Sequence, residues 1–220
     1  MNINPEVFRR YTLAIQSHYN PVQYHNKTHA ADVTQTNYYF MKKCGFETQA
    51  QMTQLEKVAM IVAPMVHDTD HPGFNNIFLI NTTNKMALRY NDKSVLENHH
   101  VALAFDIMHH SEDMRIFDAF TFEVYKKIRE MIVGMVLGTD MALHFKELGS
   151  MKDRVNSNDF SPQEKDKQEC MVFLTHMSDI SNPTKPWDLC YKWTHLLFIE
   201  FFNQGDKEKE FGLPVTFLMD

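Results

Sequence analysis

Four short segments of the sequence carry histidines and carboxylates at spacings that suit a metal site. His25 and His29 lie four residues apart, and the run His67-Asp-Thr-Asp-His71 holds three potential ligands and one further acid. The other two segments are Leu96-Glu-Asn-His-His100 and His176-Met-Ser-Asp179. Side chains three or four residues apart on a helix point the same way, so each pair can converge on one ion. Twelve histidines in 220 residues support this interpretation, because imidazole is the commonest metal ligand.

These residue types indicate phosphoryl chemistry. Mixed imidazole and carboxylate ligands suit zinc, iron or manganese, and an oxygen-rich shell suits magnesium or manganese at a neighbouring position. Two cations that share a bridging carboxylate can clamp a phosphoryl group for in-line displacement by a metal-bound hydroxide. The pattern therefore favours a metal-dependent phosphohydrolase.

Each segment also has a purely structural interpretation. Glu97 fits the third position of a capping box that begins at Ser94. Asp179 can begin a turn before Pro183, and Asp70 can cap or hydrogen-bond its own loop. The metal interpretation rests on the occurrence of all these groups in one sequence. One His-Asp doublet ends an apolar run, and other His and Asp groups lie on separate predicted helices.

Helices must position these residues, because apolar side chains recur three or four positions apart while strict alternation never extends beyond a few residues. Helices are predicted over Pro5–Ser17, Phe122–Leu137 and Asp188–Asn203. The sequence thus predicts an all-α fold, a compact multi-helix bundle, in one domain that spans residues 1–220.

Capping boxes predict further helix starts, since a Ser or Thr followed three residues later by Glu satisfies the first free N–H groups of a helix. They are Thr53-Gln-Leu-Glu56, Ser94-Val-Leu-Glu97 and Ser161-Pro-Gln-Glu164, the last with proline at the first helical position. The polar stretch Lys152–Asp159 predicts a loop, and the scattered methionines predict core filling.

The composition supports a globular protein and excludes several function classes. The chain is 44% hydrophobic and 23% charged, and its net charge of −6 gives no basic surface for nucleic acid or for an anionic membrane. Its three cysteines lack C-x-x-C spacing, which argues against a disulfide framework and favours the reducing cytosol. No apolar run of 18 residues and no signal-peptide core is present, so we expect a cytoplasmic protein without a membrane segment.

Taken in order, these segments resemble the catalytic domain of class I cyclic nucleotide phosphodiesterases, within the HD-domain superfamily. The motifs that carry the resemblance are Tyr24-His25-Asn26-x-x-His29-Ala30-Ala31-Asp32, His67-Asp68-x-Asp70-His71-Pro72-Gly73, Tyr90-Asn91-Asp92-x-Ser94-Val95-Leu96-Glu97-Asn98-His99-His100, Thr139-Asp140-Met141, Ser178-Asp179-Ile180-Ser181-Asn182-Pro183 and Phe201-Phe202-x-Gln204-Gly205-Asp206. A lone His-Asp pair occurs throughout the superfamily, whereas the ordered set is specific.

The resemblance implies two divalent metal ions, Zn²⁺ and Mg²⁺, with Mn²⁺ as an alternative. The expected zinc ligands are His29, His67, Asp68 and Asp179. Asp68 would also bridge to the second ion, most of whose ligands are water. The residues expected to orient those waters are His71, Glu97 and Thr139.

The resemblance also implies hydrolysis of 3',5'-cyclic nucleotides to 5'-monophosphates, which ends a cyclic nucleotide signal. A metal-bridging hydroxide would attack phosphorus, and His25, helped by Glu97, would protonate the leaving O3'. The residues expected to bind substrate are Tyr24, Asn76, His100, Met141, Asn182, Thr194, Leu197 and Phe198. Asn182 favours cyclic AMP over cyclic GMP, because one amide can pair with both N6 and N7 of adenine and because cyclic-AMP-selective members often have asparagine there.

The chain departs from the family at its ends. It stops at Asp220, before the helical segment that carries the purine-reading glutamine and the phenylalanine that sandwiches the base, and a helical part is also absent before Met1. We therefore expect a partial catalytic domain without its purine-binding segment. Two alternatives stay open: another HD-type metal phosphohydrolase, or a catalytically silent nucleotide-binding fragment. The oligomeric state is not set by the sequence.

Overall fold

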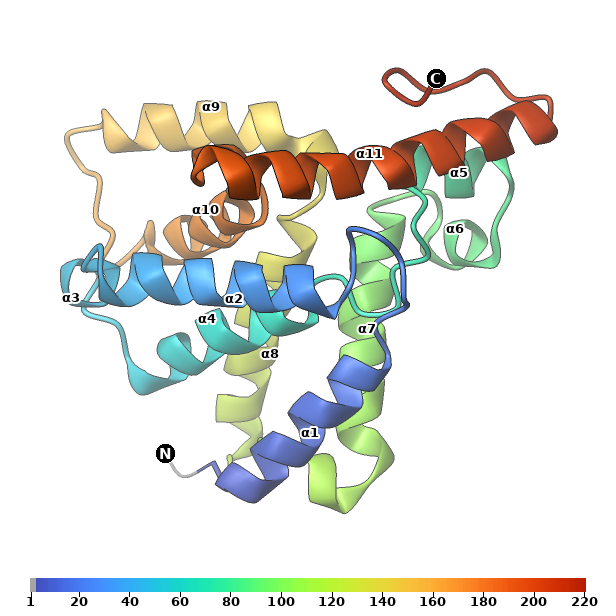
Figure 1. Ribbon diagram of the computed structural model, residues 1–220. Helices are drawn as coiled ribbons and strands as arrows, with labels where there is room; N and C mark the ends of the chain where they lie inside the picture. The colour runs from blue at the N-terminus through green and yellow to red at the C-terminus, as the bar shows by residue number, and fades with distance from the viewer. Residues whose placement is uncertain (1–2) are drawn as a thin grey trace.

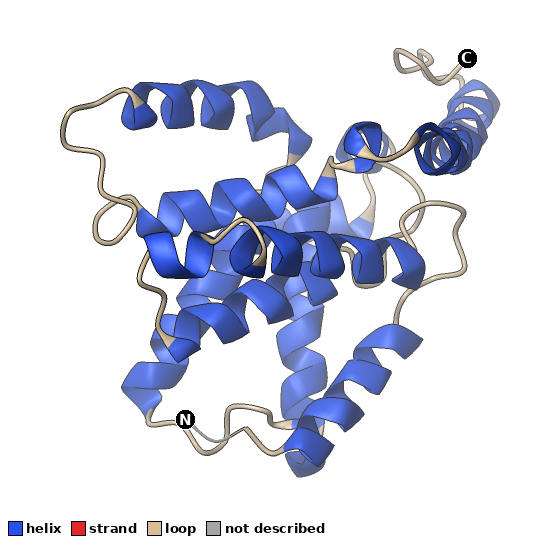
Figure 2. Cartoon of the chain, turned by 60° about the vertical axis from the view of Figure 1, so that its left-hand side comes forward, coloured by secondary structure: helices blue, strands red, loops and turns tan. Residues whose placement is uncertain are grey.

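The computed structural model describes residues 3–220, and all regular structure within this range is helical (Figure 1). The first part of the chain forms α1 (Pro5–Ser17), α2 (Lys27–Lys42), α3 (Phe46–Gln49), α4 (Gln54–Val66), α5 (Asn76–Asn81), α6 (Lys85–Tyr90) and α7 (Val95–His110). The second part forms α8 (Phe122–Leu137), α9 (His144–Val155), α10 (Lys167–Asp179) and α11 (Trp187–Glu210). Short 3-10 helices lie at η1 (Glu112–Met114), η2 (Met141–Leu143) and η3 (Asn182–Thr184). The prediction of an all-α fold is confirmed, as Figure 2 shows by colour.

The hydrophobic core lies among α2, α4, α8 and α10, which pack against one another. Its fully buried side chains include Met60, Ile128, Ile132, Met135 and Met171, so methionines fill the core as predicted. Helix α7 packs on α8 and contributes Val101, Phe105 and Met108 to the same core. None of the helices in residues 3–220 has the length and apolar character needed to cross a membrane.

Two helix starts are fixed by side-chain caps that the sequence contains. The Thr53 box is confirmed, since the N–H of Thr53 donates to Glu56 at 2.6 Å and the N–H of Glu56 donates to the Thr53 hydroxyl at 3.3 Å. The Asn26 side chain accepts from the N–H groups of Thr28 and His29 at 2.8 and 3.3 Å. This cap places His29 in the first turn of α2, facing inward.

The capping box predicted at Ser94 is wrong, although α7 does begin at the next residue. Ser94 has a left-handed φ of 39°, and its hydroxyl donates to Asp140 at 2.8 Å. The Glu97 carboxylate instead accepts from the amide of Asn76 at 3.0 Å. Both partners of the box are thus engaged by other elements.

The helix start predicted at Ser161 is also wrong, because α10 begins only at Lys167. Turns replace the predicted first turn, and the Asp166 carboxylate accepts from the Ser161 N–H at 2.7 Å. Arg154 binds the same carboxylate with two nitrogens at 2.8 and 2.9 Å. The predicted loop Lys152–Asp159 is therefore shifted, since α9 continues to Val155 and the segment without helix runs over residues 156–166.

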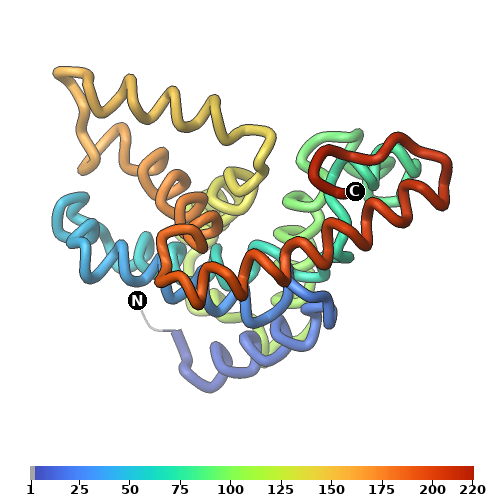
Figure 3. Tube along the Cα trace, turned by 45° about the horizontal axis from the view of Figure 1, so that its top comes forward, coloured from blue at the N-terminus to red at the C-terminus, as the bar shows by residue number. Residues whose placement is uncertain are grey.

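Helix α11 is longer than the predicted helix Asp188–Asn203 and carries the C-terminal tail back along its own end (Figure 3). Glu208 accepts from the N–H and the hydroxyl of Thr216 at 2.7 and 2.6 Å. A Cβ on Gly205 would lie only 1.6 Å from the carbonyl oxygen of Met219, so the tail can pass this closely only over glycine.

Candidate active site

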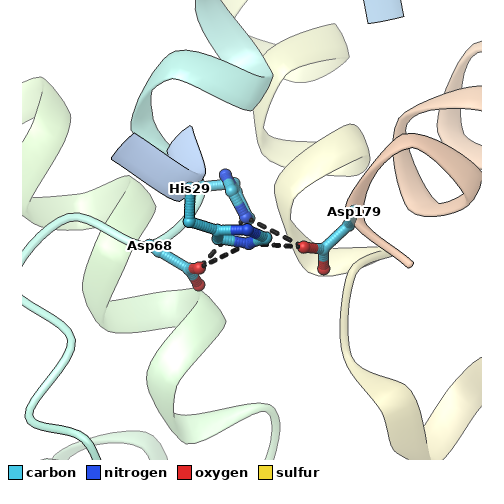
Figure 4. A group of neighbouring side chains, drawn as sticks. His29, Asp68 and Asp179 are labelled. Atoms are coloured by element: carbon cyan, nitrogen blue, oxygen red, sulfur yellow. Dashed lines mark hydrogen bonds and ion pairs between the residues drawn. The ribbon is translucent and has the colours of Figure 1, made fainter. Parts of the chain in front are cut away.

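Two histidines and two aspartates from three helix ends converge on one point (Figure 4). The Nε2 atom of His29 lies 2.9 Å from Asp179 Oδ1 and 3.4 Å from Asp68 Oδ2. The Nε2 atom of His67 lies 3.1 Å from Asp68 Oδ2 and 3.3 Å from Asp179 Oδ1. Ligand atoms about 2.0–2.2 Å from one zinc ion are separated by such distances.

The chemistry of these four residues fits a divalent cation. The Nδ1–H of His67 donates to the Pro64 carbonyl at 2.7 Å, which leaves the Nε2 lone pair directed at the carboxylates. Asp68 Oδ2 is buried without a hydrogen-bond partner. Burial opposes ionisation of the acids, but the facing imidazoles hold the pKa of Asp68 and of Asp179 below the usual range. The sequence-predicted ligand set is thus brought together.

The other oxygen of Asp68 faces a second group of imidazoles. Asp68, His71 and His100 form a further cluster of potential ligands, in which Asp68 Oδ1 lies 3.7 Å from His100 Nε2. Burial lowers the pKa of His100 to about 4, so this imidazole is neutral at physiological pH. Its Nδ1–H donates to the Thr69 carbonyl at 2.6 Å, which leaves a lone pair on Nε2. The two oxygens of one carboxylate therefore serve two adjacent positions.

His71 presents the opposite tautomer. The Gly73 N–H donates to His71 Nδ1 at 3.0 Å, so in the neutral ring the proton sits on Nε2. Burial and the neighbouring charge of His25 lower the pKa of His71 well below its usual value. His71 can therefore donate a hydrogen bond into the site, as a residue that orients water would.

His25 is held by a glutamate that the sequence analysis did not single out. His25 Nδ1 lies 2.6 Å from Glu200 Oε2, and the other oxygen of Glu200 accepts the N–H groups of Tyr24 and His25 at 2.6 and 2.9 Å. Burial lowers the pKa of His25, but the bond to Glu200 and the charges of Asp68 and Asp179 outweigh it, and the pKa is raised. The only signal in the sequence was one acid inside an apolar stretch of a predicted helix.

Glu97 and Thr139 also line the cavity that His25 lines. Burial, reinforced by the charge of Asp140, raises the pKa of Glu97 to about 7. Its carboxylate accepts from Asn76, which lies on α5. The Thr139 hydroxyl donates to the Val136 carbonyl at 2.8 Å, so its oxygen can still accept a hydrogen bond.

Asp68 and Asp179 line a cavity of about 660 Å³, whereas His29 and His67 are fully buried and are not among its lining residues. Besides the residues above, the predicted substrate residues that line it are Tyr24, Asn76, His100, Met141, Asn182, Thr194 and Leu197. Phe198 is not among the lining residues, which instead include Phe201. Leu197, Phe201 and Gln204 recur every three or four residues on one face of α11, whereas Phe198 is turned away and packs near Phe202.

Asn182 has a fixed orientation in this cavity. The Tyr24 hydroxyl donates to Asn182 Oδ1 at 2.5 Å. Asn182 Nδ2 is buried and has no partner. An unpartnered buried donor at a cavity wall is available to an acceptor on a bound ligand.

Comparison with known proteins shows the family of the chain. The family model for 3'5'-cyclic nucleotide phosphodiesterase matches residues 24–220. The chain belongs to this family. The crystal structure of the phosphodiesterase domain of the RhoPDE fusion protein from Salpingoeca rosetta superposes with a TM-score of 0.90 at 31% identity, covering 100% of this chain and 69% of that one.

Two curated relatives of this phosphodiesterase-family chain are similar along nearly its whole length. The Caenorhabditis elegans protein named probable 3',5'-cyclic phosphodiesterase pde-6 is 38% identical over 98% of the chain. The 3',5'-cyclic-AMP phosphodiesterase 4C of Rattus norvegicus is 39% identical over 99% of the chain. The alignments cover 29% and 42% of those proteins, so the chain spans less than half the length of either.

Proposed function

We propose that this chain carries the metal site and the proton donor of a 3',5'-cyclic nucleotide phosphodiesterase, and that residues 1–220 are part of one catalytic domain. One observation carries the proposal: Asp68 and Asp179 of the four-residue cluster line the same cavity as the His25–Glu200 pair. A phosphodiester has no good leaving group at neutral pH, so its hydrolysis needs an acid at O3' and compensation of the phosphate charge.

The metal ions are assigned by donor type. We assign Zn²⁺ to the cluster of His29, His67, Asp68 and Asp179, and Mg²⁺ or Mn²⁺ to the adjacent position that Asp68 shares. When bound, the two cations neutralise phosphate charge and lower the pKa of water. The residues assigned to orient water at the second position are His71, Glu97 and Thr139.

His25 is assigned as the acid that protonates O3'. Its Nδ1 is engaged by Glu200, so that Nε2 is the nitrogen free to donate. The anionic partner helps to raise the pKa of His25, which favours the protonated form that a proton donor needs, whereas a metal ligand must be neutral. Its ring is stacked on His71 with 4.0 Å between centroids, which fixes the plane of the ring.

We assign the base-binding side of the cavity to Tyr24, Met141, Asn182, Thr194 and Leu197, and we propose a preference for cyclic AMP. With Oδ1 of Asn182 turned toward Tyr24, Nδ2 can donate to N7 of adenine, and the second lone pair of Oδ1 can accept from N6. Guanine presents O6 in place of N6, and its lone pairs repel Oδ1.

We also propose a cytoplasmic location, because the three cysteines are free.

Hydrolysis of cyclic AMP, cyclic GMP and a nucleoside triphosphate by the chain with Zn²⁺ and Mg²⁺ tests the proposal. We expect 5'-AMP from cyclic AMP, slower turnover of cyclic GMP and none of the triphosphate, with Asp68→Ala inactive. Hydrolysis of the triphosphate alone would assign the chain to a different HD-type phosphohydrolase. Nucleotide binding without turnover would make it a silent binding fragment.

A further inference from the structure

The connection between α1 and α2 holds the loop that carries the metal-binding residues. Residues 18–20 form part of this connection and lie upstream of the region that matches the family. The N–H of Asp70 donates to the carbonyl of His18 at 3.0 Å. The N–H of Asp68 donates to the hydroxyl of Tyr19 at 3.3 Å. Two consecutive residues of the connection thus bind the backbone of the loop.

Asn20 contributes a third and more specific contact. Its Nδ2 donates to Asp70 Oδ1 at 2.9 Å and to the carbonyl of His71 at 3.1 Å. From the opposite side, His99 Nε2 on α7 lies 2.8 Å from Asp70 Oδ2. One carboxylate therefore ties the α1–α2 connection and α7 to the same turn of the loop.

Asp70 also meets a conformational requirement of this turn. Its φ of 63° lies in the left-handed region, which Asp and Asn tolerate better than other residues with a side chain. The turn separates Asp68 from His71, the two loop residues that face the second metal position. A change in the backbone at Asp70 would move both.

We propose that Asn20 and Asp70 are positioning residues, whose contacts set the distance between Asp68 and His71 and so the affinity for the second cation. This inference rests on the proposed function only for the identity of that cation. The Gly73 N–H binds the His71 ring at Nδ1, and Asn20 binds the His71 backbone carbonyl. The direction of His71 Nε2 therefore depends on both hydrogen bonds. Asp70 itself is outside every group of potential ligands found in residues 3–220.

Metal affinity, measured by competition with a chromogenic chelator for Mn²⁺ after the zinc position is filled, tests the inference. We expect Asn20→Ala and Asp70→Ala to weaken Mn²⁺ binding roughly 10–100-fold, the usual effect of losing a group that supports a metal site. Asp70→Asn should stay within about threefold of the parent chain, because Asn adopts the left-handed turn and keeps an acceptor for Asn20.

Asn84→Ala is the matched control, since Asn84 caps α6 through Met86 and is not a lining residue of the cavity. It should lower Tm and leave Mn²⁺ affinity unchanged. Parent-like Mn²⁺ affinity in Asn20→Ala would overturn the inference, and so would loss of Mn²⁺ in Asp70→Asn, which would make Asp70 a ligand. If the parent chain binds both ions but does not hydrolyse cyclic nucleotides, the proposed function is refuted. The present inference would still stand, because the affinity comparison does not use activity.

Discussion

Glu200 binds His25 through both of its carboxylate oxygens, one at the ring and one at the backbone N–H. The two residues are separated by 175 positions in the chain, so this contact joins the segment just before α2 to the middle of α11. A carboxylate that fixes an imidazole at Nδ1 sets its tautomer, its orientation and its charge. These are the three properties that a proton donor at Nε2 needs.

Replacing His25 tests this role directly. His25→Ala should slow cyclic nucleotide hydrolysis by roughly 10²–10⁴-fold, the usual contribution of positioned acid catalysis. Zinc content should stay at the parent level, because His25 is outside the His29, His67, Asp68 and Asp179 cluster. Steady-state kinetics and elemental analysis of the same preparation check both. Loss of zinc would identify His25 as a ligand, and a near-parental rate would exclude it from proton transfer.

Replacing Glu200 should change the pH dependence. Since a donor must be protonated, the rate falls as pH rises through the raised pKa of His25. Glu200→Gln removes the charge that raises this pKa, so the alkaline limb of kcat/KM should move to lower pH, by roughly one unit for each 1.4 kcal/mol of lost interaction. The control is Glu208→Gln, which should leave the alkaline limb in place. Glu208 is a buried glutamate on the same helix as Glu200, but it binds Thr216. A limb that stays in place in Glu200→Gln would show that Glu200 does not set the charge of His25.

Asp68 should be the one residue whose loss empties both metal positions. Its Oδ2 faces His29 and His67, while its Oδ1 faces His100. Asp68→Ala should therefore abolish stoichiometric binding of both ions in equilibrium dialysis. Asp32→Asn is the control, because Asp32 lies near the N-terminal end of α2, as His29 does, but pairs with Lys185 at 2.8 Å. Retention of one full equivalent by Asp68→Ala would show that Asp68 does not bridge the ions.

Glu97 should destabilise the metal-free protein at alkaline pH. Its carboxyl has an ordinary value of 4.5 and a pKa of about 7 when folded, so ionisation costs stability increasingly above pH 4.5 and fully above pH 7. The corresponding decrease in the free energy of unfolding is at most about 3.4 kcal/mol. Glu97→Gln should therefore raise Tm at pH 8 by roughly 5–10 °C in the presence of a chelator, while lowering activity, and the gain should shrink at pH 5.

Glu130→Gln, at an exposed position of α8, is the control for this comparison and should show no such gain. An equal Tm for Glu97→Gln and the parent chain at pH 8 would mean that other groups in the folded protein already offset the cost of ionising Glu97.

Residue type and spacing were enough to predict the fold class and a metal site, whereas the ligand set of His29, His67, Asp68 and Asp179 followed from the family resemblance. These four residues sit at or near helix ends. Asn26 caps the helix of His29, and His67 follows the last residue of α4. The capping box at Thr53 formed although Lys167 also contacts the Glu56 carboxylate, because that contact leaves both hydrogen bonds of the box in place.

Long-range contacts were not predictable. Ser94 and Glu97 match a capping box as well as Thr53 and Glu56 do, but Asp140 and Asn76 engage them from other elements. Glu200 was missed because its partner, His25, is distant in sequence. Local pattern identifies which groups can ligate or cap, whereas tertiary partners decide which of these bonds form.

Tyr24 should control selectivity between the two nucleotides through Asn182. The hydroxyl of Tyr24 holds Oδ1 and so prevents the amide from turning its Nδ2 toward O6 of guanine. Tyr24→Phe frees the amide to rotate, so the ratio of kcat/KM for cyclic AMP over cyclic GMP should fall by roughly 2–10-fold, the value of one hydrogen bond. Metal content should not change. Tyr11→Phe, which removes a buried hydroxyl bound to the Ala104 carbonyl, should reduce stability and leave the ratio unaltered. An unchanged ratio in Tyr24→Phe would mean that the orientation of Asn182 does not determine which base is preferred.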